Sequence, residues 1–372
     1  MKKISKAILL SLGLIPMVLG SCGGGETECD PTDPTGECYV EPSCDETDPD
    51  SECYIPPKPT NRVTITVKDE NGVLLGSFEQ LKSIGIYLKT IRDAGIYSKK
   101  SDENLVFNRF FKDNDFTQPV MTTDLFTTDT TLYAHYISET YEAVAYKDGA
   151  DFKTAFKNFN DALLRGNRKS YESVKYGIMD ADIDPDNDNR LIGIYDHSKF
   201  PISWGGGMSA GTWNREHVWP QSRMLKPGQP TNVGASDINH ATDLVNLRAC
   251  EYTTNEAHSN YYFGFPNSGP QTYYTPQYDR GEVVRILLYM ESAYDLYLVG
   301  NDTSHIPTAS KSNAYGYLPD LLRWWLDEPT PSEFEIRRQD VIKTFQNNRN
   351  PFVDEPLLIH SMHDVTKATP AA

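Results

Sequence analysis

The apolar and polar positions of the chain change pattern three times. Residues 7–19 form an apolar run broken only by small residues and one proline. Residues 23–59 show no apolar periodicity, and Gly, Pro, Thr and acidic residues dominate them, which predicts a solvated stalk. After residue 60 the patterns of strands and amphipathic helices begin. The 372 residues therefore predict a short leader, a stalk, and a globular region of a small module plus a larger domain.

The beginning of the chain has the features of a secretory signal. Three lysines within the first six residues precede the apolar run, which is too short to span a bilayer comfortably. The run ends in Leu-Gly-Ser-Cys at residues 19–22, which resembles the bacterial lipobox. That resemblance implies a lipoprotein signal peptide at 1–21, lipidation of Cys22, and an extracellular protein anchored to the surface of the bacterial membrane. An ordinary signal peptide with an incidental cysteine is the alternative.

The stalk, residues 22–60, carries eleven acidic residues against one lysine and contains a short repeat. Each copy of the repeat, 29–42 and 44–57, holds two cysteines nine positions apart. In an oxidising compartment the simplest pairing is local. Four cysteines allow three pairings, and the carboxylate density is also compatible with weak cation binding, so the connectivity stays open. The cysteines are Cys29, Cys38, Cys44 and Cys53.

Residues 61–137 have the pattern of a small β-rich module. Apolar and polar positions alternate over 62–68, a turn sequence follows at 69–72, and apolar residues resume, which predicts a hairpin. A helical stretch near 81–94, a further strand and a closing strand at 131–137 come next. The expected order is strand, strand, helix, strands.

This module resembles the Listeria–Bacteroides repeat, also called the internalin B-repeat. The resemblance rests on 67–74, 110–119 and 127–136, and it implies a small β-grasp-like spacer. One departure is that Arg109 and Phe110 occupy the positions of the family's glycine-tryptophan pair.

The residues with catalytic potential lie in two motifs further along the chain. In the first, 213–222, a carboxylate precedes an imidazole directly as Glu216 and His217. Neighbouring side chains on a strand point to opposite faces, so these two serve one site only if the strand is twisted or ends at the cleft. In the second, 243–260, Thr253 and Glu256 fit a capping box.

That cap predicts a helix from Thr254, with the amide of Asn255 facing a cavity from its first turn. A hard cation takes carboxylate and amide oxygens of this kind.

These motifs resemble the bacterial endonuclease I family. The resemblance rests on 214–222, 243–260, 280–285 and 348–354. It implies an α+β protein whose nuclease domain, 138–372, has the ββα-metal (His-Me finger) fold with surrounding helices. By the same resemblance His217 is the general base, Glu216 and Asn255 hold the metal ion, and Mg²⁺ is the usual ion, with Mn²⁺ or Ca²⁺ as alternatives.

The chemistry of the residues agrees with these roles. An imidazole with the ordinary pKa of about 6.5 is largely neutral at pH 7 and accepts a proton from attacking water, so the rate is expected to fall near pH 6 to 7. The family commonly has arginine two residues before the last asparagine of the second motif, where this chain has His258. We therefore expect another arginine at the phosphate: Arg248, or as second choice Arg215.

The net charge of −17 is unusual for a protein that meets a polyanion. Much of the acidity lies in the stalk, however, and 201–250 holds four basic residues against three acidic ones. We predict a monomeric, sequence-nonspecific endonuclease that acts on DNA, with RNA as a further substrate. The alternative is a surface binding or adhesion protein with an inactive nuclease fold; the intact Glu216, His217 and Asn255 favour the enzyme.

Two further segments predict scaffold helices. Residues 282–298 and 333–347 have amphipathic patterns, and Ser332 with Glu335 fits a capping box at the start of the second.

Overall fold

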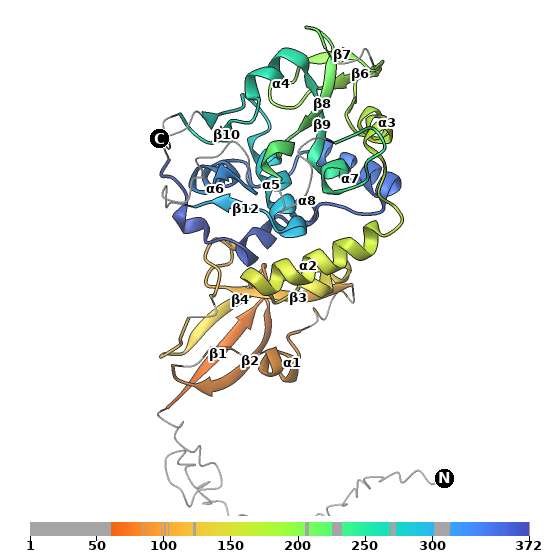
Figure 1. Cartoon of the computed structure of the whole chain (residues 1–372). Coiled ribbons are helices and arrows are strands. Elements are labelled where there is room, and N and C mark those ends of the chain that lie inside the picture. The colour runs from red at the N-terminus through yellow and green to blue at the C-terminus, as the bar shows by residue number, and fades with distance from the viewer. Residues whose placement is uncertain are drawn as a thin grey trace, which may run out of the picture. The chain divides into compact units, whose positions relative to one another are not determined.

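The computed structural model describes most of the chain after residue 60 (Figure 1). The described residues are 61–371 except 84, 87, 98, 100, 101, 103, 122–123, 205–207, 225–232, 267, 269–272 and 301–312. The expected signal peptide, the lipidation of Cys22, the stalk and its disulfides lie outside the described residues.

The first folded part is a four-stranded sheet in the order β2-β1-β4-β3. Its elements are β1 (Arg62–Lys68), β2 (Leu74–Leu81), α1 (Leu88–Asp93), β3 (Leu105–Phe111) and β4 (Thr130–Ser138). β1 and β2 form the predicted antiparallel hairpin, whereas β1 and β4 pair in parallel at the centre. Val63, Ile65 and Val67 are buried on one face of β1, as their alternation predicts. The predicted order of strands and helix is confirmed.

This sheet has a hydrophobic cluster of its own, but polar contacts join it to the helices that follow. The buried Arg109 guanidinium donates to the Asp148 carboxylate at 2.5 Å and to the Ser361 hydroxyl at 2.7 Å. The backbone N–H of Ser138 donates to Glu355 at 2.8 Å. Arg109 thus joins the sheet to the helical part, at a position where the resemblance to the repeat predicts glycine.

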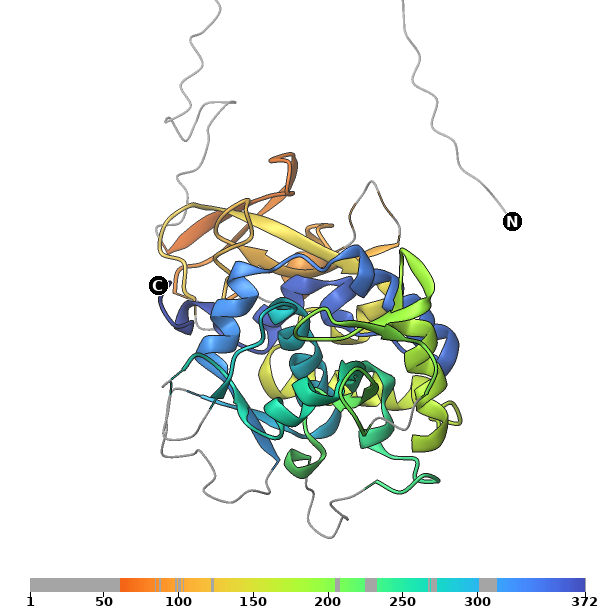
Figure 2. The same ribbon diagram turned by 90° about the horizontal axis from the view of Figure 1, so that it is seen from above.

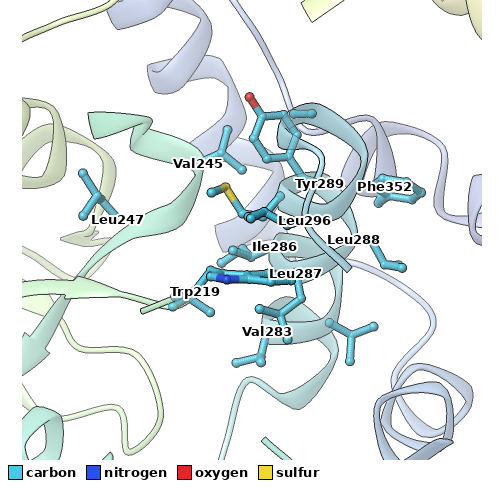
Figure 3. Packing of buried hydrophobic residues seen from close by; sticks show 14 of the residues in the cluster. Trp219, Val245, Leu247, Val283, Ile286, Leu287, Leu288, Tyr289, Leu296 and Phe352 are labelled. Carbon is cyan, nitrogen blue, oxygen red and sulfur yellow. The ribbon is translucent and has the colours of Figure 1, made fainter. Parts of the chain in front are cut away.

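The helical part is built around one buried helix, α5 (Arg280–Tyr294). Every residue from Gly281 to Tyr294 is buried, so the predicted amphipathic helix is instead enclosed on all sides. Figures 1 and 2 both show it inside the other elements. Figure 3 shows Ile286 and Leu287 of this helix in the same buried cluster as Trp219. The surrounding helices are α2 (Gly149–Leu164), α3 (Tyr171–Ala181), α6 (Leu318–Asp327), α7 (Glu333–Gln346) and α8 (Pro351–Asp354), with the 3-10 segment η1 (Glu139–Val144) before α2.

The cap predicted for the second scaffold helix is confirmed. Ser332 accepts from the backbone N–H of Glu335 at 3.2 Å, and Glu335 accepts from the backbone N–H of Ser332 at 2.8 Å. α7 begins at Glu333 for this reason.

Short strands complete the fold in separate small sheets. They are β5 (Ile183–Asp184), β6 (Asn187–Ile192) and β7 (Lys199–Pro201) in one sheet, then the pairs β10 (Tyr262–Phe263) with β11 (Tyr273–Tyr274) and β12 (Tyr297–Val299) with β13 (Ala314–Tyr317). Helices and sheets in separate groups confirm a mixed α and β class. Within the described part of the chain, no helix has the length and apolar character needed to cross a membrane.

Candidate active site

The two catalytic motifs come together as a hairpin followed by a helix. β8 (Trp213–His217) pairs antiparallel with β9 (Leu247–Glu251), and α4 (Tyr252–His258) follows β9 directly. The helix begins where the Glu251 carboxylate accepts from the backbone N–H groups of Thr253 at 2.6 Å and Thr254 at 3.1 Å. The predicted capping box of Thr253 and Glu256 is therefore wrong, because Glu251 supplies the cap and Glu256 instead accepts from the Tyr252 hydroxyl.

A cavity of about 330 Å³ lies where β8 ends. Glu216, His217 and Asn255 all line it, so the structure brings the three predicted residues together. The neighbours Glu216 and His217 can line one cavity because the strand ends at His217, as the sequence requires if both are to serve one site. The other lining residues are Arg215, Pro220, Gln221, Ser222, Ser259 and Asn260.

Both ring nitrogens of His217 have a contact, Nε2 with a backbone carbonyl and Nδ1 with the Gln221 amide nitrogen at 3.3 Å. Its Nε2 lies 2.9 Å from the carbonyl oxygen of Ala241. A carbonyl oxygen only accepts, so Nε2 carries the hydrogen and Nδ1 keeps its lone pair. Burial lowers the pKa of His217 to about 3. The ring is thus neutral well below pH 7, and the fall in rate near pH 6 to 7 expected from an ordinary histidine does not follow for this residue.

Glu216 is fixed through one oxygen. Its Oε1 accepts from the Tyr195 hydroxyl at 2.6 Å and lies 2.7 Å from Nδ1 of His258. Among the residues that the structure describes, Oε2 has no hydrogen-bond partner. The side chain is 3% exposed, and that exposure faces the cavity it lines.

Asn255 is oriented in a comparable way. Its amide nitrogen donates to Oδ1 of Asn214 at 2.7 Å, so its own Oδ1 is the end left without a protein partner in the described part of the chain. The cavity therefore offers one carboxylate oxygen and one amide oxygen. This donor set fits a hard divalent cation such as Mg²⁺, which keeps several waters and takes one or two protein ligands plus substrate phosphate. No group of three His, Cys, Asp or Glu side chains suited to a metal occurs in the described ranges.

Comparisons with known proteins identify nuclease relatives. A family model described as Endonuclease I matches residues 274–357. The chain is 33% identical over 235 residues to an extracellular ribonuclease of Bacillus amyloliquefaciens, a match that covers 58% of this chain and 75% of the relative. It is 31% identical over 232 residues to an extracellular ribonuclease of Bacillus subtilis (strain 168), covering 57% and 75%. The chain belongs to the endonuclease I family.

The part matched by the endonuclease I model contains α5, α6 and α7. It does not contain Glu216, His217 or Asn255, so the roles of these residues rest on the geometry of the cavity. The sequence patterns give no role to three residues that the fold brings to this region. Tyr195 contacts Glu216, Gln221 contacts His217, and Tyr315 contacts His258. Gln221 lies inside the first motif, but nothing in the local pattern distinguishes it from its neighbours.

Arg248, our first choice for the phosphate contact in this endonuclease I member, does not line the cavity. Its side chain is 1% exposed, its Nε donates to Asp182 at 3.0 Å, and its Nη1 donates to Glu282. Burial lowers the pKa of the guanidinium, but the two carboxylates outweigh this and raise it. Because both partners are buried carboxylates, the group is not available to a substrate.

Arg215, the second choice, is placed at the cavity instead. Its guanidinium carbon lies 3.7 Å from the centre of the Tyr171 ring, and its Nη1 donates to the Tyr171 carbonyl oxygen. Of these two arginines, the structure places only Arg215 at the cavity. His258 does not contact a phosphate either, because its ring is completely buried and stacks on Phe263.

Substitution of Arg248 should affect stability, whereas substitution of Arg215 should affect cleavage. Arg248→Met removes the positive charge that pairs with the buried carboxylates of Asp182 and Glu282. The free energy of unfolding should therefore fall by about 3–5 kcal/mol. Arg215→Ala should change stability by less than about 1 kcal/mol and reduce nucleic acid cleavage at least about tenfold, with Arg215→Lys intermediate. Urea denaturation and a cleavage assay on the same samples measure both. A stable Arg248→Met protein, or full cleavage by Arg215→Ala, would contradict these assignments.

Proposed function

We propose that this protein is an extracellular, metal-dependent endonuclease that hydrolyses phosphodiester bonds with His217 as general base. The observation that carries the proposal is the cavity at the end of β8, which Glu216, Asn255 and His217 all line. Oε2 of Glu216 and Oδ1 of Asn255 have no protein partner in the described part of the chain, and Nδ1 of His217 keeps a lone pair that faces the Gln221 amide nitrogen at 3.3 Å. The β8–β9–α4 unit that presents them is, in this proposal, a ββα-metal motif, and residues 61–137 are a β-grasp-like spacer.

The residues divide the reaction between them. Nδ1 of His217 takes the proton of the attacking water, while the Ala241 carbonyl holds Nε2–H and fixes the ring. Glu216 and Asn255 hold the ion, and Mg²⁺ when bound, with Mn²⁺ or Ca²⁺ as alternatives, supplies positive charge to the phosphate and the leaving oxygen. The P–O bond to the leaving oxygen breaks as the water oxygen bonds to phosphorus.

Arg215 binds a non-bridging phosphate oxygen in this proposal. Its guanidinium is already oriented by the Tyr171 ring, which limits the entropy lost when a phosphate binds. The cavity residues with assigned roles recognise phosphate and metal, not base edges, so we propose cleavage without sequence specificity. The two relatives named extracellular ribonucleases make RNA as well as DNA a proposed substrate.

We propose further that the protein acts outside the cytoplasm as a monomer held at the membrane by acyl chains on Cys22. About 0.8 kcal/mol per buried methylene favours such anchoring. Mass spectrometry of the mature N-terminus should find cleavage before Cys22 and a mass increase from acyl chains. Cys22→Ser should release the protein from the membrane fraction. An unmodified cysteine at the mature N-terminus, or cleavage elsewhere, would refute the anchor and leave the nuclease proposal intact.

The test of the nuclease proposal separates the base from the metal ligands. Glu216→Ala and Asn255→Ala should weaken Mg²⁺ binding, so excess Mg²⁺ should restore part of their rate. His217→Ala should leave Mg²⁺ affinity nearly unchanged and lower turnover by about a hundredfold or more, because a positioned base is lost. The matched control is His197→Ala, which removes a histidine that does not line the cavity.

Isothermal titration with Mg²⁺ and cleavage of RNA and of plasmid DNA, with and without EDTA, measure these effects. Wild-type cleavage that persists in EDTA would contradict metal dependence. Loss of Mg²⁺ binding by His217→Ala as severe as that of Glu216→Ala would make His217 a ligand. A wild-type protein that binds nucleic acid without cleaving it would support the alternative, a surface binding protein with an inactive nuclease fold.

A further inference from the structure

The carboxylate of Glu216 is contacted by a buried cluster that the proposed reaction does not use. It consists of Tyr195, which lies between the strands β6 and β7, His258 at the end of α4, and Tyr315 in β13. The Tyr195 hydroxyl donates to Oε1 of Glu216 at 2.6 Å, and Nδ1 of His258 lies 2.7 Å from the same oxygen. Nε2 of His258 lies 2.7 Å from the Tyr315 hydroxyl. Tyr195, His258 and Tyr315 are completely buried.

The donor and acceptor at Tyr315 and at Nε2 of His258 can be assigned from the backbone carbonyl at one end of the cluster. The Tyr315 hydroxyl lies 2.7 Å from the backbone carbonyl of Tyr261, which only accepts, so the hydroxyl proton points there. The Tyr315 oxygen is then an acceptor, and Nε2 of His258 donates to it. Nδ1, the other ring nitrogen of His258, lies against Oε1 of Glu216, so both ring nitrogens have a fixed partner and the ring links Tyr315 to the Glu216 side chain.

Aromatic rings on several sides hold the His258 ring in this orientation. It stacks on Phe263 with 4.6 Å between ring centres and 15° between ring planes. Tyr195 packs edge-on against it at 5.3 Å, and Tyr274 is 5.1 Å away. A ring packed in this way has little room to rotate, so the hydrogen bond to Glu216 has one geometry.

Tyr195 is also fixed, and at a conformational cost. Its φ of +82° lies in a region that residues with a side chain rarely adopt. Its backbone N–H donates to Asp279 at 3.2 Å, and its carbonyl accepts from the N–H of Tyr278 at 2.9 Å. These contacts maintain the unusual backbone, which directs the hydroxyl to Glu216.

We propose that His258 and Tyr195 are positioning residues that occupy Oε1 of Glu216, so that Oε2 alone is presented to the metal ion. Tyr315 acts one step further out by orienting His258. This inference rests on the proposed function, because it explains how Glu216, one of the proposed metal ligands, is oriented. It assigns a role to His258, which stands where the resemblance to the endonuclease I family predicts arginine. Residues that orient a metal ligand in this way typically change metal affinity by about 10- to 100-fold when they are lost.

The test measures Mn²⁺ affinity of the full chain, because affinity reports on Glu216 without requiring turnover. Tyr195→Phe removes one hydroxyl and keeps the ring, and should raise the Kd for Mn²⁺ several-fold. His258→Phe keeps an aromatic ring against Phe263 and removes both hydrogen bonds, and should raise the Kd by about 10- to 100-fold. In both variants kcat at saturating Mn²⁺ should stay within a few-fold of wild type, because the general base is unchanged.

The matched control is Tyr289→Phe, which also removes one fully buried hydroxyl. That hydroxyl donates to Asp243 at 2.6 Å and has no contact with Glu216. The control should lose stability in the manner of Tyr195→Phe but keep wild-type affinity for Mn²⁺. An increase in Kd for Tyr289→Phe equal to that for Tyr195→Phe would show a general effect of stability and overturn the proposal.

Glu216→Ala distinguishes failure of this inference from failure of the proposed function. If Glu216→Ala binds Mn²⁺ as tightly as wild type, Glu216 is not a ligand and the proposed function fails at that step. If Glu216→Ala loses Mn²⁺ while His258→Phe and Tyr195→Phe bind it as wild type does, the positioning role is refuted and the ligand assignment stands. If His258→Phe does not fold, Tyr195→Phe decides the outcome alone.

Discussion

The geometry of the candidate site depends on a buried carboxylate, Asp182, directly after α3. One of its oxygens accepts from Arg248 at 3.0 Å and from the backbone N–H of Ala249 at 2.6 Å, and the other accepts from Arg338 of α7 at 2.8 Å. Arg248 also pairs with Glu282 of the central helix α5. Burying these charges is costly unless each is paired, and here each has a partner of opposite sign. The network therefore ties α3, α5 and α7 to one strand, β9.

Fixing β9 also fixes the candidate site residues of β8, because the two strands pair residue by residue. Arg248 is the cross-strand partner of Glu216 in this register, so the ion pairs of Arg248 hold the hairpin at the level of Glu216. Arg248 anchors the hairpin in the core, whereas Glu216 reaches the cavity. Side chains on paired strands are positioned more precisely than side chains on loops, and here ion pairs also fix the strand pair. The low pKa of His217 has the same origin, since the enclosed hairpin removes water from the ring.

Sequence patterns predicted the local features of this arrangement. The alternation over 62–68 gave a correct hairpin, Ser332 with Glu335 gave a correct cap, and the adjacent Glu216 and His217 proved to share a cavity. These features depend on residues close together in sequence. The start of α4 was misassigned because Glu251, at the end of β9, competes successfully with Glu256 for the first turn of the helix.

Features that depend on distant partners were not predictable. Asp182 and Arg248 are 66 positions apart, so the sequence around Arg248 gives no indication that this arginine is buried, and the motif predicts it as the phosphate ligand. α5 has an amphipathic pattern, yet its polar positions are buried as well, because α2, α6 and α8 pack against it and Glu282 pairs with Arg248. Tyr195 and Tyr315, which surround Glu216 and His258, come from separate strand regions and carry no motif of their own.

The proposed reaction requires Glu216 and Asn255 together to hold a divalent ion beside His217. Anomalous diffraction from a crystal soaked in Mn²⁺ locates such an ion. We expect one strong peak in the cavity, about 2.0–2.5 Å from both Oε2 of Glu216 and Oδ1 of Asn255 and outside bonding distance of the His217 ring. A peak bonded to Nδ1 of His217, or a fully occupied Mn²⁺ site elsewhere with none in this cavity, would contradict it.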